Sequence, residues 1–134
     1  MTKRTQILQA LMDDIVAAGI VDEGNITRRL AFLHEVNDFP AVCFSQATER
    51  RLHYGAGRKL AQLDLQLRGF VHGEDAPRLA EELAKSLENA VDDYAKSHRD
   101  LDLEEARVYT LRTDEGLYEP HGIADLNIEI TYEV

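Results

Sequence analysis

Residues 122–134, the last stretch of the sequence, place the strongest constraint on what this chain can fold into. Apolar side chains recur there at every second position, at Leu126, Ile128, Ile130 and Tyr132. A period of two is typical of a β-strand with one buried and one polar face. A strand must pair with other strands, so we expect the fold to close around a sheet. The polar face carries an acidic row made of Asp125, Glu129 and Glu133.

Size and composition indicate a single domain, residues 1–134. A chain of 134 residues with 44% hydrophobic content suits one compact core. No apolar run approaches the length of a membrane span, and the first residues lead into an amphipathic helix rather than a signal peptide. Cys43 is the one cysteine, which excludes a disulfide within the chain and fits a reducing cytoplasm. Its apolar surroundings in the sequence predict a buried, inert thiol.

The net charge of −10 is unevenly distributed along the chain. Residues 1–73 hold nine basic and eight acidic side chains, whereas residues 74–134 hold six basic and seventeen acidic ones. Such a chain is a poor candidate for binding nucleic acid, because contacts to phosphates need a basic face. The charge is compatible with a protein that lies beside DNA without binding it, although solubility alone is the simpler explanation.

Two segments have helical periodicity. The first spans residues 2–19, with Gly19 as its C-terminal stop and apolar positions at Leu8, Leu11, Met12, Ile15 and Val16. The second opens after Gly73, with Asp75 as N-cap and Pro77 in the first turn. Its apolar stripe consists of Leu79, Leu83, Leu87, Val91 and Tyr94.

Four segments are predicted to be strands, at residues 39–45, 61–71, 105–112 and 122–134. Gly69 interrupts the alternation of the second strand and is expected to mark a β-bulge. Residues 22–27 are interpreted as a connector, and residues 28–36 as either a short strand or irregular structure. Residues 46–59 are polar, contain two glycines and lack an apolar period, so we expect a long mobile loop between the first two strands.

This order of elements predicts an α+β fold of two layers. We expect two amphipathic helices on one face of a mainly antiparallel, four-stranded sheet. The other sheet face would be polar and free, or would meet a partner.

No catalytic, cofactor or metal motif is evident, so we expect a protein that is not an enzyme and needs no cofactor. The histidines at positions 34, 53, 72, 98 and 121 lack the spacing of zinc ligands. The glycines at 55 and 57 do not complete a phosphate-binding loop. The serines lie outside any nucleophile-elbow context, and no pair of carboxylates is predicted to share a pocket.

The long loop gathers basic and aromatic side chains that are candidates for docking a partner, namely Arg50, Arg51, His53, Tyr54, Arg58 and Lys59. They would suit an acidic protein surface, such as the acidic half of a neighbouring copy. A solvated loop without a role is an equally good interpretation. Binding of nucleic acid ranks third, because only two side chains here can stack on bases.

The layout as a whole resembles the tail terminator proteins of long-tailed bacteriophages. The resemblance rests on the order of its parts: the N-terminal helix, the proline-entered strand 39–45, the long loop, the strand 63–71, the helix 79–94 and the closing strand 125–132. It covers nearly the whole chain but contains no signature motif. Head–tail connectors and other tail-completion proteins are of similar size.

The resemblance implies a structural virion protein, assembled in the host cytoplasm and located at the head-proximal end of the tail. Proteins of this family form a six-fold ring on the tail tube, stop its polymerisation and present a surface to the head. Partners would be other copies of the chain, the tube protein and a head-completion protein, with DNA passing through the lumen. The acidic row at 125, 129 and 133 would suit such a lumen or an interface.

Two alternatives remain open on the sequence. A head-completion or stopper protein belongs to the same morphogenetic class. A small regulatory or ligand-binding domain, with a pocket between helix and sheet, belongs to a different one.

Overall fold

The computed structural model describes residues 2–53 and 55–134. Two helices, α1 (Lys3–Ala17) and α2 (Ala76–Ser97), accompany five strands. The strands are β1 (Ile26–Thr27), β2 (Ala41–His53), β3 (Lys59–His72), β4 (Leu103–Thr113) and β5 (His121–Glu133). Three short 3-10 turns, at Glu23–Asn25, Leu33–Glu35 and Arg99–Leu101, join them.

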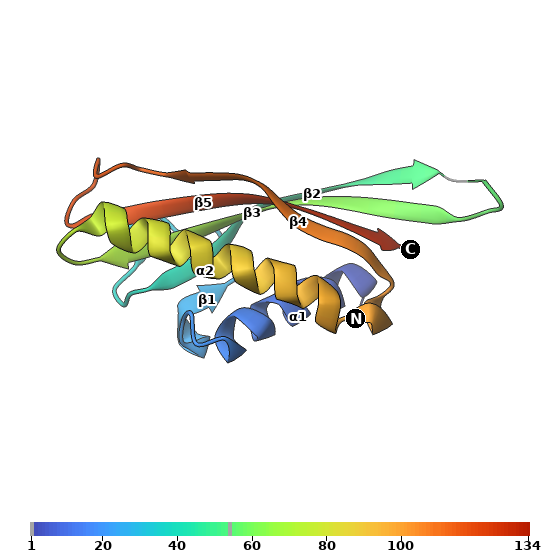
Figure 1. The fold of residues 1–134 in the computed structure, drawn as a ribbon, viewed down its shortest axis with the longest axis horizontal. Coiled ribbons are helices and arrows are strands. Elements are labelled where there is room, and N and C mark those ends of the chain that lie inside the picture. Colours follow the sequence, from blue (N-terminus) through green and yellow to red (C-terminus); the bar gives the residue numbers. More distant parts are fainter. Residues whose placement is uncertain (1, 54) are drawn as a thin grey trace.

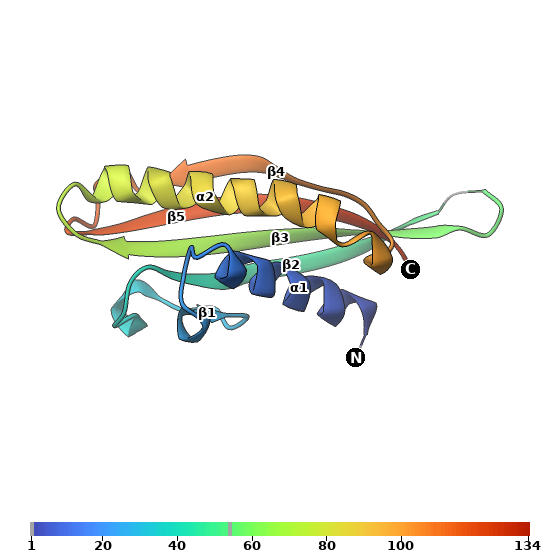
Figure 2. The same ribbon diagram turned by 60° about the horizontal axis from the view of Figure 1, so that its bottom comes forward.

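The strands form one sheet in the order β1-β2-β3-β5-β4. β1 runs parallel to β2, and every other neighbouring pair is antiparallel. Both helices lie on the same face of the sheet (Figures 1 and 2). The predicted α+β architecture is therefore confirmed, with five strands rather than four. β1 was missed because its two residues, inside the expected connector, are too few to show a period.

The core fills the space between the helices and one sheet face. The alternating positions of β3 and β5 that face the helices are buried, and they meet the apolar stripes of both helices. Tyr94 of α2 ties the two helices together, because its hydroxyl donates a hydrogen bond to the carbonyl oxygen of Ile7 at 3.2 Å. Burial raises the pKa of Tyr94 well above its usual value, which keeps this donor protonated.

A long hairpin replaces the loop that was expected at residues 46–59. β2 continues to His53 and pairs with β3 from Lys59 onward, so that Thr48 lies opposite Asp64 and Arg50 opposite Gln62. The hairpin projects beyond the ends of both helices (Figure 1). The prediction was wrong because the side chains of residues 46–52 are largely exposed on both faces of β2, so backbone pairing with β3 persists there without an apolar period.

Gly69 does not mark a bulge. It pairs regularly with Val42 and Ala124, and the irregularity of β2 lies between Phe44 and Gln46. A Cβ atom on Gly69 would lie 2.5 Å from Cδ2 of Leu83. The glycine therefore allows α2 to pack closely on β3.

The start of α2 also differs from the prediction. Asp75 occupies the N-cap position in a left-handed conformation and makes no side-chain cap hydrogen bond. Its carboxylate instead forms an ion pair with Arg78 at 3.1 Å. Thr2 is the residue that caps a helix, since its hydroxyl accepts a hydrogen bond from the backbone N–H of Thr5 at 3.1 Å.

Part of the far sheet face is covered by the segment that precedes β2. Ala41, Cys43 and Phe70 form a second buried cluster there, against which partly buried side chains from residues 31–39 pack. The segment 28–36 is thus irregular apart from one 3-10 turn. In the described residues, no helix is long and apolar enough to cross a membrane.

Candidate interaction surfaces

The far face of the sheet is polar where it is not covered. Residues that are successive cross-strand partners form rows that run across β2, β3, β5 and β4. We call two residues of the same row level with each other. One row contains Thr48, Asp64, Glu129 and Arg107. At its centre the carboxylates of Asp64 and Glu129 lie on adjacent positions, an arrangement of like charges that normally destabilises a sheet.

The predicted acidic row is present on this face, but its carboxylates are paired with arginines. Arg68 contacts Asp125 with two nitrogens, at 2.7 and 3.1 Å, and the Asp125 side chain is buried. Glu129 lies 3.5 Å from Arg107, and Glu133 lies 3.4 Å from Arg58. The row is therefore part of a mixed-charge surface rather than a bare acidic one.

A shallow hollow of about 250 Å³ lies in the middle of the polar face. Its lining consists of Gln46, Thr48, Asp64, Leu65, Gln66, Tyr109 and Asn127. Apart from Leu65 the lining residues have polar side chains, and Asp64 carries the one charge among them. Such a surface offers no cation for a phosphate group within the hollow.

The basic residues predicted to dock a partner do not form one cluster. Arg50 donates a hydrogen bond to Gln62 at 2.7 Å on the polar face, whereas Arg51 pairs with Glu49 on the helix side. Arg58 lies at the hairpin tip and contacts Glu104 at 2.8 Å. Lys59 is exposed at the base of the turn. The other two candidates, Tyr54 and the side chain of His53, lie outside what the structure describes.

Tyr132, Glu49 and Arg51 form a small network on the helix side of β2 and β5. The hydroxyl of Tyr132 donates a hydrogen bond to Glu49, which also accepts one from Arg51. Burial, followed by the bond to Glu49, raises the pKa of Tyr132 to about 12. Burial acts to raise the pKa of Glu49, but the hydrogen bonds from Tyr132 and Arg51 together lower it below its usual value. The sequence could not predict this network, because it depends on β2 continuing past residue 45.

Among the residues that the structure describes, the sheet has two free edges. β4 is the last strand on one side, and on the other side β1 covers β2 at Val42 and Cys43 and leaves the rest of β2 without a neighbouring strand. Large apolar side chains are exposed near each edge. Tyr109 and Leu111 lie on β4, and Leu30 lies beside Phe44 and Gln46 of β2.

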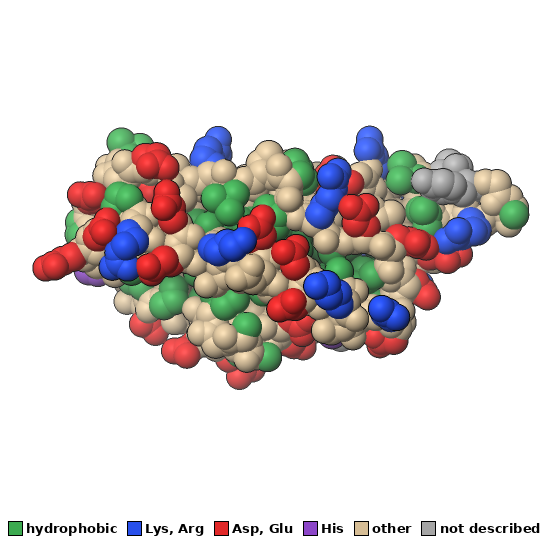
Figure 3. All heavy atoms as spheres, in the orientation of Figure 1, with side chains coloured by type: hydrophobic (Ala, Val, Ile, Leu, Met, Phe, Trp, Pro, Cys, Tyr) green, Lys and Arg blue, Asp and Glu red, His purple; other side chains and the backbone are tan. Residues whose placement is uncertain are grey.

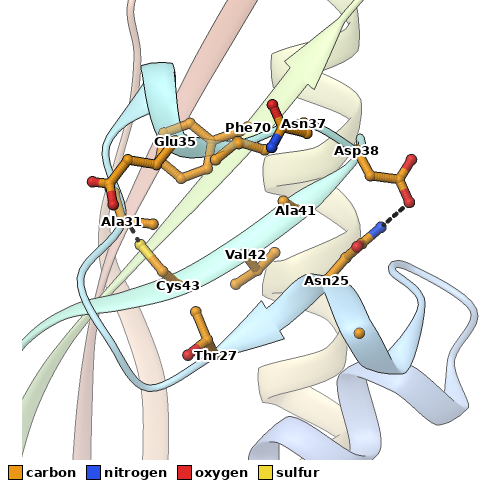
Figure 4. A pocket seen from close by; sticks show the side chains of 12 residues that line it. Asn25, Thr27, Ala31, Glu35, Asn37, Asp38, Ala41, Val42, Cys43 and Phe70 are labelled. Carbon is orange, nitrogen blue, oxygen red and sulfur yellow. Dashed lines mark hydrogen bonds between the residues drawn. The ribbon is translucent and has the colours of Figure 1, made fainter.

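A cavity of about 290 Å³ lies at the end of the sheet next to β1 (Figure 4). Val42, Cys43 and Phe70 supply apolar lining, and the amide of Asn25 donates a hydrogen bond to Asp38 at 3.1 Å. Cys43 is buried, and this burial raises the pKa of its thiol, as an inert core cysteine requires. The described residues contain no group of three or more side chains that could hold a metal ion.

Sequence reasoning missed one cluster of aromatic rings. His72 and His121, opposite each other at the ends of β3 and β5, have ring centroids 4.6 Å apart, and Phe39 stacks on His72 at 5.6 Å. Their positions at the ends of two predicted strands were the available signal. Elsewhere, acidic and basic side chains are interspersed over the face that carries α2 (Figure 3).

The fold is that of an α+β domain whose sheet has one helix-covered and one polar face. A chain in the virion of a native gene transfer agent particle matches it with a TM-score of 0.60 and 14% identity, over 96% of this chain and 92% of the other. At this identity the similarity concerns the fold alone.

Sequence comparison gives the family. The model of the bacteriophage tail tube terminator protein family matches residues 1–134, and the chain belongs to this family. The tail tube terminator protein p142 of Escherichia phage T5 is 26% identical over 155 residues, covering 99% of this chain and 95% of that protein. The chain is therefore a structural component of a virion tail and not an enzyme.

Proposed function

We propose that this protein caps the end of the tail tube as a six-fold ring, stops tube polymerisation and provides the surface to which the head joins. The observation that carries the proposal is the match of the whole chain to the terminator family. A ring needs two unlike patches on each copy, and the two free sheet edges differ in sequence, charge and shape.

The polar sheet face is the proposed lining of the lumen. Three of its arginines, Arg68, Arg107 and Arg112, are engaged by carboxylates, so few cations are left to hold DNA phosphates. Asp64 and Glu129 at its centre would repel a phosphate backbone. DNA would then pass without specific binding.

The hairpin of β2 and β3 is the proposed docking element for a partner such as the tube protein. It projects beyond the helices and presents Arg58 and Lys59 near its tip (Figure 1). Exposed cations on a projecting ribbon can steer docking to an acidic surface and set its orientation. The head-completion protein would meet the opposite end of the ring.

Charge reversal on the polar face tests its part in the lumen. Glu129→Lys with Glu133→Lys should leave the melting temperature within a few degrees, because both carboxylates make only long, partly exposed ion pairs. Ring assembly or DNA passage should be impaired. An unchanged phage titre with the double variant would contradict a lumen-facing role.

The function itself is tested by electron microscopy of lysates in which the gene of the parent phage carries an early stop codon. Overlong tails of variable length, without heads, are expected if the protein ends tube growth. Tails of normal length beside leaking or empty heads would move the protein to the head-completion side. Intact infectious particles would contradict both assembly roles and favour a regulatory or ligand-binding domain.

A further inference from the structure

The strands at the two free edges of the sheet, β2 and β4, run in opposite directions and share rows of cross-strand partners. The four long strands alternate in direction across the sheet in the order β2, β3, β5, β4. If copies are related by rotation about an axis roughly parallel to the strands, β4 of one copy comes to lie antiparallel to β2 of the next. Backbone groups on both edges are then available for an antiparallel ladder.

Side chains on the helix side of the two edges are complementary in shape. Leu111 of β4 is 44% exposed, and it is level with Phe44 of β2 through Leu126 and Leu67. Beside Phe44, on the free edge of β2, lies a hollow of about 270 Å³. Its lining includes Leu8, Leu30 and Ala47. The Leu111 side chain of a neighbouring copy at the same height would meet this hollow.

Charges along the two edges are also complementary. Arg50 of β2 is level with Glu105 of β4, through Gln62 and Thr131. Glu104 is the next residue of β4, and Arg51 is the next residue of β2. The β4 edge thus offers carboxylates at the height where the β2 edge offers guanidinium groups.

We infer that a second copy of this chain occupies the free edge of β2. In this interface β4 of one copy pairs antiparallel with residues 44–51 of the next copy, and the side chain of Leu111 lies in the hollow beside Phe44. This inference rests on the ring of the proposed function and adds its interface and register. The sheets of all copies become continuous around the ring, with the polar face inside and the helices outside. β2 and β4 both contain bulges, but none lies between Ala47 and Arg50 of β2 or between Glu105 and Val108 of β4. These two stretches can therefore pair with each other in regular register.

A cysteine pair tests the register. Thr48 and Arg107 are level and exposed, so Thr48→Cys with Arg107→Cys places two thiols opposite each other between copies. Within one copy β3 and β5 separate them, a distance of about 14 Å that no disulfide spans. Native Cys43 is buried and does not compete. Under mild oxidation of the concentrated protein, non-reducing gels should show a ladder of three or more copies.

Controls separate this interface from other contacts. Each single-cysteine variant should give no ladder, and a dimer from Thr48→Cys alone would indicate β2 pairing with β2 and overturn the inference. Gln46→Cys with Thr110→Cys, a second level pair, should reproduce the ladder if Arg107→Cys disturbs the fold. A pair that is out of level, Thr48→Cys with Thr113→Cys, should not.

The same samples show whether the proposed interface or the proposed ring is wrong. Wild-type protein is examined for rings by negative-stain electron microscopy and by glutaraldehyde cross-linking. Rings of the wild type without a disulfide ladder from either level pair would overturn the interface and leave the ring intact. Absence of rings together with absence of a ladder would count against both. A compensating exchange, Arg50→Glu with Glu105→Arg, should restore at least half of the ring yield that either reversal alone abolishes.

Discussion

The close approach of α2 to β3 at Gly69 can be tested by adding one methyl group. In Gly69→Ala the new Cβ would lie 2.5 Å from Cδ2 and 3.2 Å from Cγ of Leu83, and 3.7 Å from Cδ1 of Leu87. The first two distances are shorter than van der Waals contact allows. Leu83 must therefore change rotamer, or the helix must move away from the sheet.

The expected loss of stability in Gly69→Ala can be worked out from the kind of contact. Adding a methyl group to a filled core costs about 1–3 kcal/mol. For a chain of 134 residues, 1 kcal/mol corresponds to about 4 °C in melting temperature. The Gly69→Ala variant should therefore melt about 4–12 °C lower. Leu83→Ala alone should cost about 2–4 kcal/mol, because Leu83 is 6% exposed within the core.

A double-mutant cycle isolates the contact. In the Leu83→Ala background the space is vacant, so Gly69→Ala should be neutral or stabilise by about 0.5 kcal/mol through the unfolded chain. Urea unfolding followed by circular dichroism measures all four free energies, with equal m-values as the condition for comparing them. Gly24→Ala is the matched control, since nothing lies within 4 Å of its added Cβ. An equal cost of Gly69→Ala in both backgrounds would refute the close-packing argument.

Three further outcomes are expected. Burial and the hydrogen bond to Glu49 raise the pKa of Tyr132 to about 12, so the stability that the protonated tyrosine contributes is complete below about pH 10 and is lost as pH rises toward 12. The difference in unfolding free energy between wild type and Tyr132→Phe should therefore change over that pH window. A difference that stays constant with pH would contradict this. Leu111→Asp should abolish ring formation seen by electron microscopy while Leu117→Asp, at a 74% exposed turn residue, should not; equal loss in both would argue against a seated leucine. Lys59→Glu at the hairpin should leave the melting temperature within about 1–2 °C but weaken attachment to isolated tail tubes in a pelleting assay, and undiminished attachment would remove the hairpin from the docking surface.

The elements that bury one face could be predicted from the sequence. The closing strand, the stripe of α2 and the strand 61–71 each have a period set by burial, and each forms where the period predicts it. The extension of β2 could not be predicted, because it is held by pairing with β3 while the side chains of residues 46–52 are largely exposed. β1 has only two residues, of which Ile26 is buried in the core, and two residues are too few to show a period.

The candidate surfaces were predicted only in part. The acidic positions 125, 129 and 133 do share one sheet face, as the period of two requires. Their arginine partners come from β3, β4 and the hairpin, at sequence separations that no local pattern reveals. The basic positions were expected to act together in a loop. In a paired strand, successive residues point to opposite faces, which sends Arg50 and Arg51 to different sides of the sheet.

Cryo-electron microscopy of purified tails would show directly where and how this protein binds. We expect a ring of this chain at the head-proximal end of the tube, with the polar sheet face toward the lumen and the helices outside. A map with this protein absent from that end, or bound as isolated copies that leave the tube end open, would contradict a terminator ring.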